Sequence, residues 1–194
     1  MGTRQLRRSS ATLRWLVLAG LAVLAAAPTE ARDAVREHIT ATVAIPASAP
    51  GQPTTAPVSI YIYGYSTDQE VQRLSKTLAD KGPDALREAL FDLEKGWIRI
   101  GNSLGYPIAV ARSKPTDKGR RIILVADRPI DFLESWRGER SLDYPFAYFD
   151  LRLGKNGKGD GDMIPAAKIR ISGSSIDVEN YSFQPAKLLG VSVR

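Results

Sequence analysis

Charged and aromatic residues gather in one connection of this 194-residue chain, and their types suit the binding of a ligand. Arginine side chains recognise anions, aromatic rings stack on apolar groups, and carboxylates serve as acids and bases. The connection follows a strand-like apolar run that ends at Asp127. We therefore predict a ligand-binding site formed by Arg128, Asp131, Glu134, Trp136, Arg140, Asp143 and Tyr144.

The same residues allow an enzymatic alternative. Glycoside hydrolases place two carboxylates around the scissile bond, and Glu134 could form such a pair with Asp131 or Asp143. Trp136 would then serve as a platform for the sugar. We favour a simpler hypothesis, because a sequence does not determine the distance between two carboxylates. In that hypothesis no residue is catalytic. Four charged side chains pair with and neutralise one another: Asp127, Arg128, Arg140 and Asp143.

The counts of histidine and cysteine exclude several kinds of active site. The chain contains one histidine, His38, and no cysteine. Serine and cysteine hydrolases of the triad type need a histidine held beside the nucleophile, and zinc sites need several histidine or cysteine ligands. We expect His38 to be an ordinary surface residue, and we predict no metal, no cofactor and no disulfide.

A glycine-rich segment at residues 154–162 suggests two further kinds of site. Asn156, Asp160 and Asp162 could bind calcium, or the glycine amides could bind phosphate with Lys155 or Lys158. The segment lacks the order of ligands of a calcium-binding loop and that of a phosphate-binding loop. We therefore favour a mobile hairpin loop that joins strands at residues 145–153 and 163–171.

Three tyrosines at every second position form an aromatic stripe. Tyr61, Tyr63 and Tyr65 share one face of a predicted strand, and Val58, Ile60 and Ile62 form the other face. Such a stripe suits contact with a carbohydrate or a protein. We favour burial beneath a helix, with cover from Leu74, Leu78, Leu86 or Leu90.

The N-terminus predicts export. Four arginines precede an apolar run at residues 15–27, and small residues follow it. This is the layout of a secretory signal peptide, and the run is shorter than the roughly 20 residues of a membrane-spanning helix. We predict cleavage near Ala31, with Ala27 as an alternative. No transmembrane segment is then expected in the mature protein, which would be periplasmic or secreted in a bacterial host.

Removal of the predicted signal peptide changes the charge balance. Residues 1–31 contain four basic residues and one acidic residue, so their removal reduces the formal net charge from +6 to +3. A nucleic-acid-binding protein normally has a clustered basic surface. The longest basic run after the signal peptide is Arg120-Arg121, so we predict no binding to nucleic acid.

Hydrophobic periodicity predicts the elements that would position these residues. Residues 38–45 and 58–65 alternate as strands, on either side of a proline-rich segment at residues 46–57. Thr67 and Glu70 have the spacing of a capping box, and the apolar stripes behind them predict a helical hairpin over residues 67–94. Further strands are predicted at 97–101, 106–113, 119–127, 145–153, 163–171, 175–182 and 187–193.

These elements predict an α+β chain. We expect an antiparallel β-sandwich or partial barrel, with the helical hairpin near the N-terminus. The predicted organisation is a signal peptide at 1–31, an N-terminal strand and proline-rich flexible segment at 32–57, and a single α+β domain at 58–194. The unbroken apolar run at residues 122–126 predicts a central strand that is buried on both faces.

Four segments of the chain together resemble a family of uncharacterised exported bacterial proteins. They are Gly-Tyr-Pro-Ile-Ala at 105–109, Ala-Asp-Arg-Pro-Ile at 126–130, the segment 140–146, and Ile-Pro-Ala-Ala-Lys-Ile at 164–169. The resemblance covers approximately residues 65–194. It implies export, and it implies no assigned activity.

Together these features favour an exported, non-enzymatic protein that binds a partner or associates with the cell envelope. Its partner would be a small molecule, a glycan or a protein, bound near residues 127–144. A carboxylate-based hydrolase at the same place is the alternative.

Overall fold

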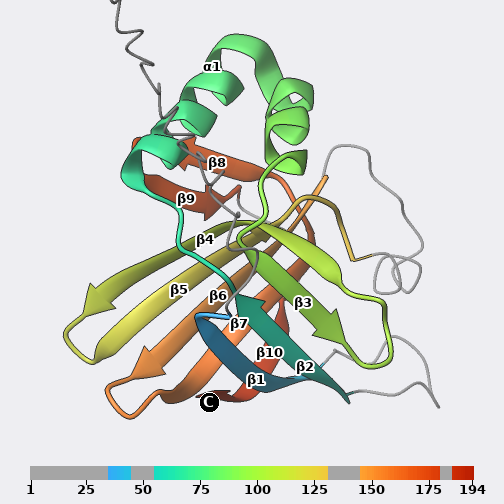
Figure 1. Ribbon diagram of the computed structural model, residues 1–194, viewed down its shortest axis with the longest axis vertical. Coiled ribbons are helices and arrows are strands. Elements are labelled where there is room, and N and C mark those ends of the chain that lie inside the picture. The colour runs from blue at the N-terminus through green and yellow to red at the C-terminus, as the bar shows by residue number, and fades with distance from the viewer. Residues whose placement is uncertain (1–34, 45–54, 131–144, 180–184) are drawn as a thin grey trace, which may run out of the picture. The chain divides into compact units, whose positions relative to one another are not determined.

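The computed structural model describes residues 35–44, 55–130, 145–179 and 185–194 (Figure 1). The chain divides into two compact units, Met1–Arg32 and Asp33–Arg194, and every described residue lies in the second unit. The predicted signal peptide therefore lies outside the described residues. Within the described ranges, no helix is long and apolar enough to cross a membrane.

Eight of the described strands form a closed antiparallel barrel (Figure 1). They are β1 (Glu37–Ala44), β2 (Thr55–Ile62), β3 (Gly96–Ile100), β4 (Tyr106–Thr116), β5 (Gly119–Ala126), β6 (Phe146–Gly154), β7 (Lys158–Ala167) and β10 (Ala186–Val193). Strand β1 closes the barrel because it pairs with β2 on one side and with β10 on the other. Residues 32–57 were predicted to precede the α+β domain, and this segment thus contributes the barrel strand β1.

Two further elements lie outside the barrel. The helix α1 (Asp68–Phe91) follows β2, and the strands β8 (Ile169–Ser172) and β9 (Ser175–Val178) form a separate two-stranded sheet. Figure 1 shows α1 above β8 and β9, and the helix contacts β8 directly. The chain is α+β, as predicted, and its sheet is a closed barrel rather than a sandwich.

Apolar side chains fill the inside of the barrel. Side chains of a strand point alternately to its two faces, and Ile122, Leu124 and Ala126 of β5 point inward together with Phe149 of β6. All four are completely buried. They belong to an inner cluster with members from all eight barrel strands, which we call the inner core.

A second apolar cluster, the outer core, covers the outer face of β4, β5 and β6. Ile123 and Val125 of β5 point into it, opposite to their inward neighbours. The helix and the small sheet supply most of the cover, with Val71, Leu74, Leu86, Leu90, Ile169, Ile171 and Ile176. The predicted burial of β5 on both faces is confirmed.

The helix begins where the capping box predicts. The Thr67 hydroxyl accepts a hydrogen bond from the Glu70 amide at 3.2 Å, and the Glu70 carboxylate accepts one from the Thr67 amide at 2.6 Å. The helix is interrupted at Gly82, whose φ of 84° is left-handed and suits glycine. Pro83 directly follows this break. The structure has one interrupted helix over Asp68–Phe91 where we predicted a hairpin of two.

Two predicted strand boundaries are wrong. The glycine-rich segment is mostly strand, because β7 begins at Lys158 and only a short turn separates it from β6. Asn156 closes that turn by accepting a hydrogen bond from the Lys158 amide at 3.1 Å. The predicted strand at 163–171 is two strands, since β7 ends at Ala167 and β8 joins the outer sheet.

The filled barrel predicts different costs for two leucine truncations. Leu124 is 0% exposed in the inner core, whereas Leu104 is 93% exposed. We expect Leu124→Ala to lower the free energy of unfolding by about 2–5 kcal/mol, because it leaves a cavity. Leu104→Ala should change it by less than about 0.5 kcal/mol. Urea denaturation measures both values, and equal effects would contradict a tightly packed interior.

Candidate functional site

The corner after β5 contains a buried carboxylate. Asp127 has a side chain that is 3% exposed, and Arg128 donates to its two oxygens at 2.9 and 2.8 Å. The Ile130 amide donates to the Pro165 carbonyl at 2.9 Å, which attaches the corner to β7. The predicted pairing of Asp127 with Arg128 is confirmed. The Arg128 guanidinium neutralises the charge of the Asp127 carboxylate, which would otherwise be costly to bury.

The structure describes only Arg128 among the predicted site residues. The others lie in the segment 131–144, outside the described residues: Asp131, Glu134, Trp136, Arg140, Asp143 and Tyr144. Their convergence into one site stays a prediction. The described chain resumes at Pro145, which lines a groove.

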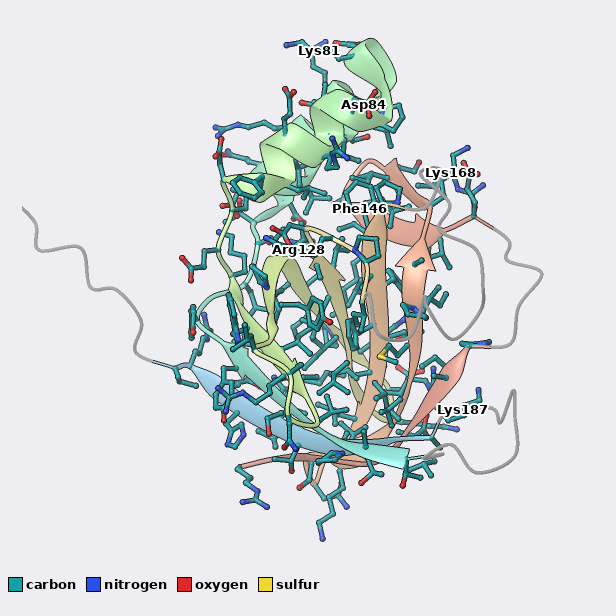
Figure 2. All side chains as sticks on the ribbon, turned by 90° about the vertical axis from the view of Figure 1, so that its right-hand side faces the viewer. Lys81, Asp84, Arg128, Phe146, Lys168 and Lys187 are labelled. Atoms are coloured by element: carbon teal, nitrogen blue, oxygen red, sulfur yellow. The ribbon has the colours of Figure 1, made fainter. Side chains whose placement is uncertain are left out.

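This groove lies between α1, the start of β6 and the β8–β9 sheet, with a volume of about 680 Å³. Binding sites for small molecules typically have about 300–1,000 Å³. Its apolar lining consists of Leu78, Pro83, Leu86, Pro145, Phe146 and Ile169. Figure 2 shows Phe146 below the helix, with Asp84 above it and Lys168 to one side. We call this space the helix–sheet groove.

Five charged residues complete the lining of the helix–sheet groove: Asp84, Arg87, Lys168, Arg170 and Glu179. Lys168 and Glu179 form an ion pair of 3.3 Å between their nitrogen and oxygen atoms. Within the described ranges, neither Arg87 nor Arg170 forms an ion pair or a hydrogen bond through its side chain. The groove therefore combines apolar walls with two exposed guanidinium groups that are available to an anion.

A second hollow shares Arg87 with the groove and is also lined by Arg128. It has a volume of about 390 Å³ and is lined by Arg87, Glu88, Phe91, Asp127 and Arg128. Arg87 lines both spaces. Phe91, at the end of α1, is 70% exposed and offers an aromatic surface there. Asp127 and Arg128 of the predicted corner thus line this second hollow, and Arg87 is common to it and to the helix–sheet groove.

Most of the lining residues were not predicted as site residues. Leu78 and Leu86 belong to the predicted helical stripes, but a stripe shows only which face is buried. The groove depends on β8 leaving the barrel after Lys168, and the alternation of Ala167, Lys168 and Ile169 continues through that point without interruption. We find no local signal in the sequence that would have placed these residues together.

The tyrosine stripe does not pack beneath the helix as we expected. The helix leucines contact the outer core, which contains none of the three tyrosines. Tyr61 instead stacks on His38, with ring centroids 4.5 Å apart and an interplanar angle of 6°. His38 is half-buried rather than an ordinary surface residue, and its Nε2 atom has no hydrogen-bond partner within the described chain.

Tyr65 belongs to a charged cluster at one end of the barrel. Its hydroxyl donates to Glu37 at 3.0 Å, and the Arg36 guanidinium lies 5.3 Å from the centre of its ring. Arg120 donates two hydrogen bonds to Glu37, at 2.8 and 2.6 Å. Alternation places Glu37 and Arg120 on the inward faces of β1 and β5, so this pair joins two strands across the barrel.

The same cluster shifts the acidity of its members. The hydrogen bond from Arg120 lowers the pKa of Glu37 below its ordinary value of 4.5, although partial burial opposes the shift. Burial, with a further contribution from the charge of Glu37, raises the pKa of Tyr65 to about 12. Both shifts keep an ionised carboxylate next to a neutral phenol at neutral pH. This is a structural arrangement, with no group near the pKa of a general acid or base.

The two aspartates of the glycine-rich segment are paired with cations. Arg152 donates to Asp160 and Asp162 at 2.8 Å each, and Lys187 donates to Asp162 at 2.6 Å. Arg121 continues this outer row by donating to Asp150 at 2.8 and 3.0 Å. These side chains bridge neighbouring barrel strands. The described carboxylates of this segment therefore do not form the open calcium-binding loop that we considered.

Comparisons with models of protein families, with curated proteins and with solved structures find no match to this chain.

The Glu37–Arg120 pair predicts a pH-dependent stability. Because the folded-state pKa of Glu37 is lowered, its stabilisation is complete above the unfolded-state value near 4.5 and is lost as the pH falls through the folded-state value. We expect Glu37→Gln to lower the free energy of unfolding by about 1.5–3 kcal/mol at pH 7. The difference from the wild type should shrink as the pH falls below 4.5.

Denaturation by urea at several pH values measures this difference. The matched control is Glu94→Gln, at an exposed position outside the cluster. An effect of Glu37→Gln that stays constant down to pH 3 would show that the charge of Glu37 does not stabilise the fold.

Proposed function

We propose that this protein is an exported, non-enzymatic binding protein that holds its ligand in the helix–sheet groove. The observation that supports this most is the location of the available space. The described apolar side chains that point into the barrel form the buried inner core, whereas the groove outside it offers about 680 Å³ with mainly apolar walls. Specific ligand sites in proteins are typically concave, mostly apolar and supplied with a few polar groups.

Hydrolysis by a pair of carboxylates is the alternative function. A hydrolase of the two-carboxylate type needs one acid with a raised pKa. Every described carboxyl group with a shifted pKa has a lowered one: Glu37, Glu70 and Asp162. The alternative hydrolase would use Glu134 with Asp131 or Asp143, which lie outside the described residues. Hydrolysis of nitrophenyl glycosides that is abolished by Glu134→Gln would support that alternative.

Export is the second part of the proposal. The arginines before residue 15, the apolar run at residues 15–27 and the small residues after it support a signal peptide. The absence of cysteine is compatible with an oxidising compartment, because no thiol is available for unwanted pairing. The mature protein would be periplasmic or released from the cell.

Expression of the full chain in a bacterium tests export. We expect a C-terminally tagged protein in the periplasmic fraction or the medium, with a mass that corresponds to cleavage near Ala31 or Ala27. Intact-mass spectrometry determines the new N-terminus. Replacement of Leu18 and Leu21 by Glu should keep the chain in the cytoplasm at full length, because it disrupts the apolar run. Uncleaved wild-type protein in the cytoplasm would refute export.

A neutral fluorescent probe tests binding in the groove. N-phenyl-1-naphthylamine becomes fluorescent in apolar surroundings, and we expect saturable binding to the wild type. Leu78→Arg should weaken it by at least about tenfold, because a charge replaces part of the apolar wall. Leu78→Gln should weaken it less. Leu104→Arg is the matched control, since Leu104 is 93% exposed and does not line the groove.

Thermal unfolding of each variant shows whether it is folded under the conditions of the titration. Probe binding that is absent in the wild type, or equal in Leu78→Arg and Leu104→Arg, would refute the groove as the binding site.

A further inference from the structure

We infer that the helix–sheet groove binds a single-chain amphiphile with one negative charge, of the class of long-chain carboxylates. This inference rests on the proposed function, and it specifies the ligand. Its basis is the combination of apolar walls with two guanidinium groups that have no partner among the described residues.

The apolar part of such a ligand matches the walls of the groove. The lining includes side chains from the helix, from the start of β6 and from β8, so three separate elements present apolar atoms to the same space. Each methylene group removed from water contributes about 0.8 kcal/mol. An alkyl chain makes use of this lining without requiring hydrogen-bond partners, and the walls are formed mainly by carbon atoms of leucine, proline, phenylalanine and isoleucine.

The charges at the groove favour an anion. Five other described arginines are paired with carboxylates: Arg112, Arg120, Arg121, Arg128 and Arg152. Arg87 and Arg170 both line the helix–sheet groove, and neither contacts a carboxylate in the described part of the chain. The planar guanidinium group matches a carboxylate through two parallel hydrogen bonds.

The net charge of the groove lining favours a ligand with one negative charge over a ligand with two. Lys168 is neutralised by Glu179. The remaining charged groups of the lining are Arg87, Arg170 and Asp84, which together give a net charge of +1. A monoanionic carboxylate compensates this charge, whereas a dianionic phosphate would leave an excess of negative charge beside Asp84. Figure 2 shows Asp84 on the helix above the groove, on the side away from the barrel.

Displacement of bound N-phenyl-1-naphthylamine by ten-carbon amphiphiles tests the inference. We expect decanoate to displace the probe from the wild type at least about tenfold more effectively than decanol, and decyltrimethylammonium to be weaker still. Decyl phosphate should be weaker than decanoate at pH 8, where its headgroup carries close to two negative charges. All measurements stay below the concentrations at which these compounds form micelles.

Variants then assign the headgroup contact. Arg87→Gln and Arg170→Gln should each weaken displacement by decanoate about tenfold, which is the loss of one charge-assisted hydrogen-bonding group. Asp84→Asn should strengthen it by roughly two- to fivefold, since a repelling charge is removed. Arg99→Gln is the matched control, because Arg99 is exposed on β3 and does not line the groove. It should have no effect.

The outcomes separate this inference from the proposed function. If the probe binds but decanoate and decanol displace it equally, or if Arg87→Gln and Arg170→Gln both behave like Arg99→Gln, the groove is a binding site and the inference of an anionic ligand is overturned. If decyl phosphate displaces the probe better than decanoate, the inference of a monoanion is overturned. If the probe itself does not bind to the wild type, the proposed function fails.

Discussion

Burial of β5 on both faces is the constraint on which the rest of the structure depends. From Ile122 onward its inward side chains are apolar and require a barrel that closes around them, and its outward Ile123 and Val125 require cover from elsewhere. Fully burying an aliphatic side chain contributes about 1.5–3 kcal/mol, so leaving either face exposed would be costly. The helix and the small sheet supply the outer cover. The corner that follows places Asp127 next to both cores, and its pairing with Arg128 offsets the cost of burying the carboxylate.

The position of the groove follows from this arrangement. The described inward side chains pack into the inner core, whereas the helix–sheet groove is lined by residues that lie outside it. The outer cover consists of two separate pieces, an interrupted helix and a two-stranded sheet, and the helix–sheet groove is lined by residues of both. The break at Gly82 changes the course of the helix next to this groove, since Pro83 and Asp84 directly follow the break and both line it.

Local patterns predicted most elements of the fold, and long-range pairing explains what they missed. The capping box at Thr67, the strands of the barrel and the two-sided burial of β5 all depend on neighbours in sequence. Closure of the barrel depends on β1 pairing with β10, which no local pattern reveals. Lys168 separates β7 from β8, which belong to different sheets, but the alternation of apolar and polar residues in the sequence does not change there. The tyrosine stripe likewise has the same spacing in the sequence whether a helix or His38 packs against it. For the site, the pairing of Asp127 with Arg128 was predictable because the two are adjacent, whereas Arg87 and Arg170 come together only through the tertiary fold.

Closure by β1 and β10 also has a consequence for the order of events during folding. The register joins Ile39 to Val193, so the final ladder connects strands that are separated by almost the whole described chain. Loop-closure entropy makes such distant pairings late and slow compared with the hairpins between consecutive strands. Until β10 has been synthesised, β1 lacks one of its two partners and the inner core stays incomplete.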